Sequence, residues 1–581
     1  MNQNILVSQI FINGLVHAGL TDVVICPGSR STPLTLVFEA HEEVQTHLCL
    51  DERSGAFLAL GLAMKSGRAV AIVCTSGTAA ANFYPAIIEA NMSQVPLIVM
   101  TADRPPELRH SGANQTIDQV KMYGDHVLWA VDMALPEQNM PDVALRNVMT
   151  TAGRAYATAT GCRKGAVHVN FPFRKPLEPS AGDQLSINSD QLVGSTNHWS
   201  PIIGHLNSLQ ENQLGQWFSR YERGIIVCGP NCPEGEFAAT VGAFALQSGY
   251  PLFADPLSGV RFGTEKSALI VGGYESGLAG GRKPEWDAPE IVIRFGAVPT
   301  SKWLNEYLNS IDPAVRLHVR SNGVWADDSH LTSDFWQIDE VAFCVTAGNI
   351  ARNFSWERRK VPPGLAWQRS VMEWEQAVQR QLSKGLQAAD FDAGYLFDFL
   401  ESETLPECNL VIGNSLPVRH LDAFGRPSAK KIHVFGNRGA SGIDGVVSTA
   451  CGIALADPDT PTFLIIGDVS FYHDMNGLLM ARELPNLTII LFNNNSGSIF
   501  RRLPVSKFGE PFEKLFLTAH DLDFSHTAQL YSLEHERFTD RSAFAAGVQR
   551  ALQNDKPYLL EIITDGAADE EARRALVASL D

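Results

Sequence analysis

The sequence has little of several features that would narrow its class at once. Its nine cysteines are an odd, scattered set without C-x-x-C spacing, so neither a redox nor a metal role is indicated for them. No apolar run is long enough to cross a membrane. The 581 residues carry a formal charge of −18, which argues against nucleic-acid binding because phosphate neutralisation needs a basic surface. We therefore expect a cytoplasmic protein that neither inserts into a membrane nor binds nucleic acid.

Other familiar signatures are also missing. There is no P-loop, no glycine-rich dinucleotide fingerprint, no repeat of short period and no low-complexity tract. The N-terminus lacks the basic lead of a targeting signal and is expected to form an amphipathic helix that ends at Gly19. A chain of this length predicts two to four domains, each with its own core.

What the sequence does contain is an alternation of short apolar runs with helical patterns, which is typical of an α/β fold with doubly wound parallel sheets. Segments 176–201 and 353–364 are rich in residues that favour turns, and we expect linkers there. Three domains follow, over residues 1–180, 200–352 and 365–581. The central domain lacks a ligand fingerprint, so we expect its role to be mainly structural.

The third domain holds the most informative stretch. Residues 462–466 and 487–492 are predicted strands, and 474–483 is a predicted helix between them. Asp468 follows the first strand and Asn494 follows the second. Ligands of parallel sheets bind at these carboxyl ends, and oxygen ligands suit Mg²⁺ held together with a diphosphate. The alternative is that Asp468 only caps a helix and the Asn run is a turn.

Four arginines also follow predicted strands: Arg30, Arg104, Arg419 and Arg438. Arginine at such positions suits the bidentate binding of carboxylate or phosphate, although Arg30 and Arg104 could each instead form a surface salt bridge. Ser415 and Arg419 should share a helix face one turn apart. The glycines around Arg438 and Ile443 allow close approach of the backbone to a ligand.

Glu52 opens a predicted helix directly after an apolar strand. It could be a helix-start carboxylate that the helix dipole stabilises. Since Leu50, Ala56 and Phe57 surround it with apolar sequence, it could instead be a buried functional acid.

The run Gly467-Asp468-Val469-Ser470, with Asn493-Asn494 further on, resembles the diphosphate and metal motif of thiamine diphosphate enzymes. Val469 departs from that motif, in which glycine is usual. The resemblance implies that Asp468, Asn494 and the carbonyl of Ser496 hold Mg²⁺ or Mn²⁺. It also implies that Glu52 hydrogen-bonds the cofactor's aminopyrimidine and promotes its imino tautomer.

Further motifs narrow the resemblance: Cys26-Pro-Gly-Ser-Arg-Ser-Thr-Pro33, Asp51-Glu-Arg53, Thr75-Ser-Gly-Thr78, Thr101-Ala-Asp-Arg-Pro-Pro106 and Gly112-Ala-Asn-Gln115. Together they resemble the 2-succinyl-5-enolpyruvyl-6-hydroxy-3-cyclohexene-1-carboxylate synthase family of the menaquinone pathway. That family decarboxylates 2-oxoglutarate and adds the resulting carbanion to isochorismate. Both substrates are dicarboxylates, which agrees with the four arginines.

The family resemblance implies roles for particular residues and domains. The first domain would bind the pyrimidine, and the third would bind the diphosphate and the metal ion. Ile443 is either core filler or, as in relatives, a wedge under the thiamine. Cofactor contacts fall on Glu52, Ser415, Ile443, Asp468 and Asn494. Catalytic roles fall on Glu52, Gln115 and Ile443, and substrate contacts fall on Arg30, Arg104, Asn114, Lys302, Ser415, Arg419, Arg438, Ile499 and Phe500. The family assembles its sites between subunits, so at least a homodimer is expected, and a homotetramer by analogy.

Two other interpretations are open at this stage. One is another thiamine diphosphate enzyme, either a 2-oxo-acid decarboxylase or a relative of acetolactate synthase. The chain lacks the adjacent His-His pair of the decarboxylases, and small monocarboxylate substrates would leave several arginines unexplained. The other is a non-catalytic coenzyme-binding α/β protein, which no nucleotide fingerprint supports.

Overall fold

The computed structural model describes residues 2–580 apart from 186–203, 264–268, 360–364 and 390. The described chain divides into two compact units. One comprises Met1–Pro201, Asn437–Asp459 and Ser470–Leu487, and the other comprises Ile202–Gly436, Thr460–Val469 and Thr488–Asp581. Parts of both expected linkers, 186–201 and 360–364, lie outside the described residues.

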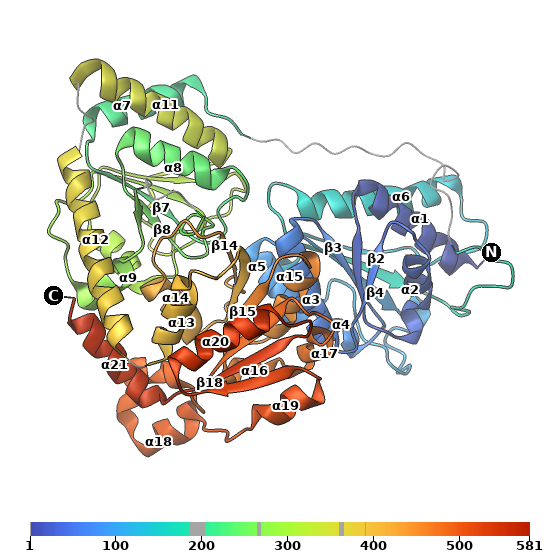
Figure 1. Ribbon diagram of the computed structural model, residues 1–581. Helices are drawn as coiled ribbons and strands as arrows, with labels where there is room; N and C mark the ends of the chain where they lie inside the picture. The colour runs from blue at the N-terminus through green and yellow to red at the C-terminus, as the bar shows by residue number, and fades with distance from the viewer. Residues whose placement is uncertain (1, 186–203, 264–268, 360–364, 390, 581) are drawn as a thin grey trace. The chain divides into compact units, whose positions relative to one another are not determined.

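The first unit is built on a six-stranded sheet of order β2-β1-β3-β4-β6-β5, and its strand pairs are parallel. Helices α1, α2 and α6 share an apolar cluster with the strands, while α3 contacts β1, β3 and β4 (Figure 1). The strands β3, β4 and β6 are buried at every residue, as expected for central strands covered on both faces. The bounds are α1 Gln3–Ala18, β1 Asp22–Ile25, α2 Thr32–Glu39, β2 Gln45–Leu48, α3 Glu52–Ser66, β3 Val70–Cys74, α4 Thr78–Asn82, α5 Tyr84–Ser93, β4 Leu97–Asp103, β5 Trp129–Asp132, α6 Asp142–Thr160 and β6 Ala166–Pro172.

The opening helix α1 ends at Gly19 as predicted, but it is not amphipathic. Its polar residues Asn4, Ser8 and Gln9 are buried with its apolar ones. Asn4 donates to the carbonyl of Arg174 at 2.8 Å, and Gln9 donates to the carbonyl of Gln184 at 2.6 Å. A returning segment of the chain therefore covers the face that the sequence pattern left polar.

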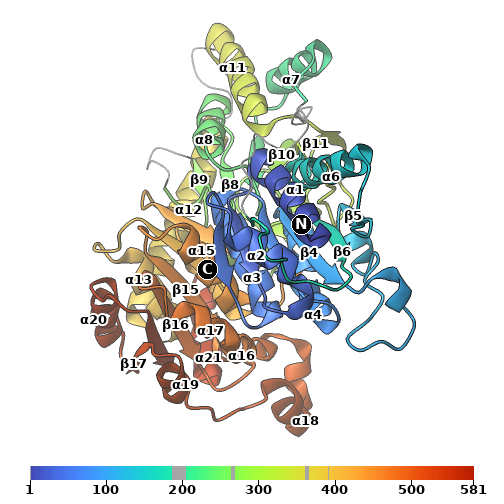
Figure 2. The ribbon, with the colours of Figure 1, turned by 90° about the vertical axis from the view of Figure 1, so that its right-hand side faces the viewer.

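The second unit contains two more six-stranded sheets. Their orders are β12-β11-β10-β7-β8-β9 and β14-β13-β15-β16-β18-β17, and helices α7, α8 and α11 pack together beside the first of them (Figures 1 and 2). The bounds in the central part are α7 Ser208–Arg220, β7 Gly224–Cys228, α8 Phe237–Ser248, β8 Leu252–Ala254, β9 Ile270–Val271, α9 Tyr274–Gly277, β10 Ile291–Phe295, α10 Lys302–Ser310, β11 Val315–Val319, β12 Asp334–Trp336, α11 Glu340–Arg359 and α12 Leu365–Ala388. The predicted α/β class with three parallel sheets is confirmed.

The last part of the chain carries the third sheet and two segments that return to the first unit. Its bounds are α13 Asp392–Glu401, β13 Cys408–Ile412, α14 Leu416–Phe424, β14 Ile432–Phe435, α15 Val446–Ala456, β15 Thr462–Gly467, α16 Asp468–His473, α17 Leu478–Ala481, β16 Leu487–Asn493, α18 Glu510–Phe512, α19 Phe524–Leu530, β17 Glu534–Phe538, α20 Arg541–Leu552, β18 Tyr558–Ile563 and α21 Gly566–Ala578. No helix among the described residues is both long and apolar enough to span a membrane.

Two predicted segments differ in the structure. Residues 353–359 belong to α11 rather than to a linker, since no helix-breaking proline occurs before Pro362. The predicted helix 474–483 is instead split into a 3-10 turn and α17. Asp474 separates the 3-10 turn from α16: its backbone is not helical (φ −124°, ψ 29°), and its carboxylate accepts hydrogen bonds from Ser448.

Candidate active site

Asp468 and Asn494 follow the neighbouring strands β15 and β16 of the third sheet. The Asp468 side chain is almost fully buried, and its Oδ2 accepts a hydrogen bond from the backbone N–H of Ser496 at 3.2 Å. Its Oδ1 accepts from the N–H of Val469 at 2.7 Å. Asp468 thus joins the ends of the two strands.

Val469 stands where the motif usually has glycine. It lies within α16 and is not among the residues with positive φ, so a β-branched residue fits this backbone without strain. The departure from the motif does not distort the turn.

The loop after β16 is held by its own side chains. The Oδ1 of Asn494 accepts hydrogen bonds from the hydroxyls of Ser496 at 3.1 Å and Ser498 at 3.0 Å. Asn495 adopts φ 54°, which asparagine tolerates better than most residues. Its side chain accepts from the N–H groups of His520 and Asp521 at 2.9 and 2.8 Å. A distant segment therefore anchors the loop.

His520 is a site residue that the sequence analysis missed. Its Nε2 lies 3.4 Å from the Asp468 Oδ2 and has no hydrogen-bond partner within the described residues. Burial raises the pKa of the Asp468 carboxyl, while its backbone hydrogen bonds and His520 favour the charged form. No local pattern in the sequence marks His520.

The donor set at this edge fits a hard divalent cation. It offers a buried carboxylate (Asp468), an amide oxygen (Asn494) and a backbone carbonyl (Ser496), all oxygen ligands of the kind that Mg²⁺ prefers. Within the described ranges, no group of three or more His, Cys, Asp or Glu side chains forms a metal site. Any metal here would therefore be shared with waters or a bound phosphate.

Glu52 is the first residue of α3, in the first unit, and is half-buried rather than buried. Leu50, expected to cover it, is 62% exposed. The neighbouring residues are firmly held: Asp51 caps α3 and accepts from Asn476 at 2.7 Å, while Arg53 donates to the carbonyl of His473 at 2.8 Å. The residues on both sides of Glu52 are thus held by hydrogen bonds, while Glu52 itself is half-buried.

Arg30 and Arg104 follow β1 and β4 in the same unit. Arg30 is 4% exposed and donates from Nη1 to the carbonyl of Phe173 at 2.8 Å. The Nε atoms of both arginines are buried and have no hydrogen-bond partner in the described chain. Buried, unused donors of this kind favour an anionic ligand over a surface salt bridge.

Asn114 and Gln115 lie on an exposed turn. Gln115 has φ 54°, and its side chain donates to the carbonyl of Ser76 at 2.9 Å. Behind this turn lies Gln119, a residue that the sequence analysis did not single out. It is fully buried and accepts from the N–H of Gly77 at 2.9 Å. Gln119 therefore holds the backbone at Gly77, next to Ser76, whose carbonyl the Gln115 side chain binds.

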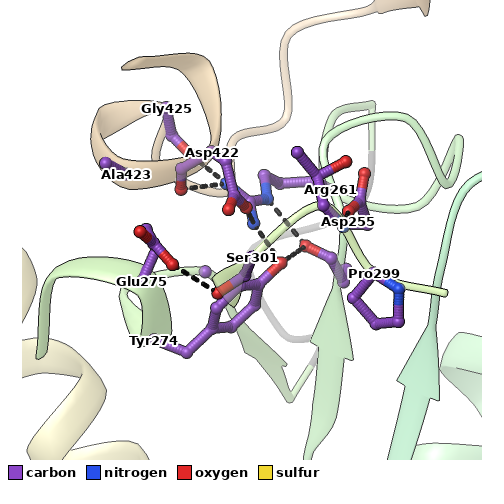
Figure 3. Close-up of polar contacts among 12 residues, drawn as sticks. Asp255, Arg261, Tyr274, Glu275, Pro299, Ser301, Asp422, Ala423 and Gly425 are labelled. Carbon is purple, nitrogen blue, oxygen red and sulfur yellow. Dashed lines mark hydrogen bonds and ion pairs between the residues drawn. The ribbon is translucent and has the colours of Figure 1, made fainter. Parts of the chain in front are cut away.

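Ser415 and Arg419 lie at the start of α14, as predicted. Ser415 precedes the helix with φ 74°, and Arg419 donates from Nη1 to its carbonyl at 2.6 Å. The other end of α14 is held by Arg261, which is fully buried. Arg261 donates to the carbonyls of Asp422 and Gly425 at 2.9 and 3.1 Å (Figure 3). A cation on the last carbonyls is a favourable helix end.

The remaining candidates of the second unit differ in setting. Lys302 is the first residue of α10. Its side chain is 68% exposed and lies 3.5 Å from Glu306 in an ion pair, so within this chain Lys302 lies on the surface rather than in a buried site. Ile499 and Phe500 follow the Asn494 loop directly, are half-buried, and Phe500 packs on the ring of Phe516.

Arg438 and Ile443 belong to the first unit, on residues 437–445, which we call the Arg438 loop. Both are half-buried. The hydroxyl of Ser470, two residues after Asp468, donates to the carbonyl of Ile443 at 2.8 Å. The candidates thus form two groups: the metal-loop and α14 residues in one unit, and Glu52, Arg30, Arg104 and the Arg438 loop in the other.

Comparison with known proteins agrees with this arrangement. The family model described as "Thiamine pyrophosphate enzyme, N-terminal TPP binding domain" matches residues 5–122, and "Thiamine pyrophosphate enzyme, C-terminal TPP binding domain" matches residues 424–562. The fold and these two matches thus define a thiamine diphosphate-dependent enzyme.

Curated relatives are more specific. The chain is 45% identical to the 2-succinyl-5-enolpyruvyl-6-hydroxy-3-cyclohexene-1-carboxylate synthase of Roseiflexus sp. (strain RS-1), over 100% of this chain and 98% of that protein. It is 46% identical to that of Roseiflexus castenholzii over 99% and 98%, and 39% identical to that of Bacillus cytotoxicus over 98% and 95%. The chain therefore belongs to the 2-succinyl-5-enolpyruvyl-6-hydroxy-3-cyclohexene-1-carboxylate synthase family, and it is a carbon–carbon bond-forming transferase.

Proposed function

We propose that this enzyme decarboxylates 2-oxoglutarate and adds the resulting four-carbon unit to isochorismate, releasing CO₂ and 2-succinyl-5-enolpyruvyl-6-hydroxy-3-cyclohexene-1-carboxylate in menaquinone biosynthesis. The names of relatives that match over nearly their full length support the product. The observation that carries the substrates is the pair Arg30 and Arg104, of which Arg30 is buried and Arg104 half-buried, and whose buried Nε donors are unused in the described chain. Such groups match dicarboxylate substrates.

The metal-loop residues would hold a divalent cation. Asp468, Asn494 and the Ser496 carbonyl are the proposed ligands of Mg²⁺ or Mn²⁺, which would bind together with the cofactor's diphosphate. Asp468 is suited to this role because a dication would stabilise a carboxylate that burial otherwise disfavours. Ser415, at the start of α14, would contact the cofactor beside them.

Thiamine diphosphate, when bound, supplies the electron sink for decarboxylation and carbon–carbon bond formation. The chain's own residues then have defined roles. Glu52 would hydrogen-bond the aminopyrimidine and hold a proton there. Ile443 would support the thiamine, and Gln115 would act beside the reacting groups.

The substrate contacts would come from charged groups around an apolar wall. Arg30, Arg104, Arg419 and Arg438 would bind carboxylates, with Asn114, Ser415 and Lys302 as further polar contacts. Ile499 and Phe500 would exclude water from one side of the site.

We further propose that the enzyme works in the cytoplasm as at least a homodimer, and as a homotetramer by analogy with the family. The first unit exposes large apolar side chains close in sequence to candidate residues: Leu48 and Leu50 before Glu52, and Tyr472 after Asp468. They are 61%, 62% and 54% exposed. A second copy would bury them, and light scattering of the purified protein measures the assembly.

An isotope assay tests the function. With 2-oxoglutarate labelled at its 1-carboxyl group, thiamine diphosphate and Mg²⁺, we expect label release as CO₂ to be slow alone and fast when isochorismate is added, with the product mass appearing in step. Fast release without isochorismate would indicate a simple decarboxylase. No cofactor-dependent turnover on either substrate would favour the non-catalytic alternative.

A further inference from the structure

We propose that Glu89, on α5 of the first unit, is a positioning residue that fixes the Arg438 loop for catalysis. Glu89 is 2% exposed. Its Oε1 accepts a hydrogen bond from the backbone N–H of Gly439 at 2.7 Å, and its Oε2 accepts from the N–H of Ala440 at 2.7 Å. The importance of the loop for the reaction rests on the proposed function above.

The carboxylate is buried without a compensating cation. Its remaining contact is the hydroxyl of Ser93, which donates to Oε1 at 2.5 Å, and no Lys, Arg or His forms an ion pair with it in the part of the chain that the structure describes. A buried charge is costly unless hydrogen bonds satisfy it. Charge-assisted bonds from two consecutive amides are short and strong, so the loop and the carboxylate depend on each other.

A second observation shows that the Arg438 loop packs against α5, the helix that carries Glu89. A Cβ at Gly439 would lie 2.7 Å from the Met92 Cβ and 2.7 Å from the Ser93 amide nitrogen. Contacts that short do not occur, so only glycine lets the loop backbone approach the end of α5. The glycine contact and the Glu89 hydrogen bonds thus fix the same two peptide groups.

The other end of the loop is fixed separately. Gly445 has φ 67°, and a Cβ there would overlap the ring of Phe57 on α3. The hydroxyl of Ser470 donates to the carbonyl of Ile443 at 2.8 Å. Between the two fixed points lies Ser441 with φ 61°, a backbone that a β-carbon makes unfavourable.

Arg438 and Ile443 therefore flank the segment that Glu89 holds. Arg438 directly precedes Gly439 and Ala440, whose backbone amides Glu89 binds. Among the described residues, Glu89 is the α5 side chain that accepts hydrogen bonds from these two amides. Small displacements of such groups can lower turnover about a hundredfold. Glu89 acts through the loop, without touching the substrate itself.

The test compares Glu89→Gln with Glu39→Gln. Glu39 is an exposed glutamate of the same unit, whose carboxylate accepts from the hydroxyl of Thr46. In Glu89→Gln the amide nitrogen faces one of the loop amides, so one acceptor is lost. We expect amide exchange in a peptide covering 437–445 to rise about tenfold or more. We expect kcat/KM to fall about a hundredfold, with a raised KM for at least one dicarboxylate, while Glu39→Gln behaves as wild type.

Exchange and kinetics that match Glu39→Gln would overturn the proposal. If Glu89→Gln does not fold, Glu89→Asp keeps the charge, withdraws it by one methylene and is judged by the same two readouts. The exchange readout does not depend on the substrates. If the wild-type enzyme does not turn over 2-oxoglutarate and isochorismate, the proposed function is contradicted. If amide exchange in the folded Glu89→Gln variant is unchanged, the role of Glu89 is contradicted.

Discussion

The guanidinium group of Arg261 lies 3.1 Å from the carboxylate of Asp422, and the two side chains are 0% and 2% exposed. Arg261 also donates from Nε to the carbonyl of Ala254 at 2.7 Å and contacts the hydroxyl of Tyr274 (Figure 3). The ion pair joins the central sheet to α14, the helix that begins at the candidate residue Ser415. The central part of the chain thus has a definite structural role, because it holds one end of a site helix.

Replacing this arginine should destabilise the fold strongly. Arg261→Met leaves Asp422 buried without its cation and frees several carbonyls, which should cost about 3–5 kcal/mol of unfolding free energy. Urea unfolding measures the change. Arg426→Gln is the control, since Arg426 and Glu401 form an exposed pair (45% and 33%) at 3.2 Å that should be worth less than about 1 kcal/mol. Equal small effects of both substitutions would show that Arg261 does not hold α14.

Asp474 should make stability depend on pH. Burial raises its pKa from 3.8 to about 6, despite the hydrogen bonds from Ser448 and the nearby Arg53. Between these values the folded chain binds more protons than the unfolded chain, so stability falls as pH rises from about 4 to 6. The contribution is about 3 kcal/mol for a shift of this size. In Asp474→Asn the free energy of unfolding should change less with pH between about pH 4 and 6. Denaturant unfolding at several pH values measures this, and the same pH dependence in wild type and variant would refute the assignment.

The metal loop gives a prediction about cofactor binding. Removing divalent cations with a chelator should abolish turnover, and Mg²⁺ or Mn²⁺ should restore it. Asp468→Asn should weaken thiamine diphosphate binding by about tenfold or more and remove its dependence on Mg²⁺, because a neutral amide attracts the cation less. Calorimetric titration with and without Mg²⁺ checks this. Unchanged, Mg²⁺-dependent binding in the variant would exclude Asp468 as a ligand.

Arg30 and Arg104 should determine affinity for the dicarboxylates. Arg30→Leu or Arg104→Leu should lower kcat/KM for one substrate by about 10- to 100-fold, the equivalent of one charge-assisted hydrogen bond. Arg68→Gln is the control, since Arg68 has a 54% exposed side chain 3.7 Å from Asp22. Steady-state kinetics with each substrate varied in turn assigns each arginine. If kcat/KM is unchanged for both substrates, that arginine is not a ligand.

Much of the fold and part of the site could be predicted because their signals are local. Strand β7 is a continuous apolar run that ends at turn residues, and Asp468 and Asn494 come at the ends of the similar, mainly apolar strands β15 and β16. Within this chain Glu52 is half-buried, since apolar neighbours in sequence do not determine what covers a side chain. The helix expected at 474–483 does not begin at Asp474, whose backbone is non-helical and whose carboxylate binds Ser448, a contact between distant segments.

The supporting residues could not be predicted for the same reason. Glu89, Gln119, Arg261 and His520 act on backbone or side-chain groups far away in the sequence. Each lies in an ordinary helix or loop pattern, so composition and periodicity do not mark it. Only the three-dimensional contacts identify these residues as the ones that hold the site.

The most direct test of the account mixes two inactive variants, Glu52→Gln and Asp468→Asn, under conditions that allow subunits to exchange. In the proposed dimer, Glu52 of one copy and Asp468 of another serve the same cofactor. Half of randomly mixed dimers are then hybrids with one intact site, so turnover should recover to about a quarter of the wild-type value. A mixture that exchanges subunits yet stays as inactive as the separate variants would contradict the shared site.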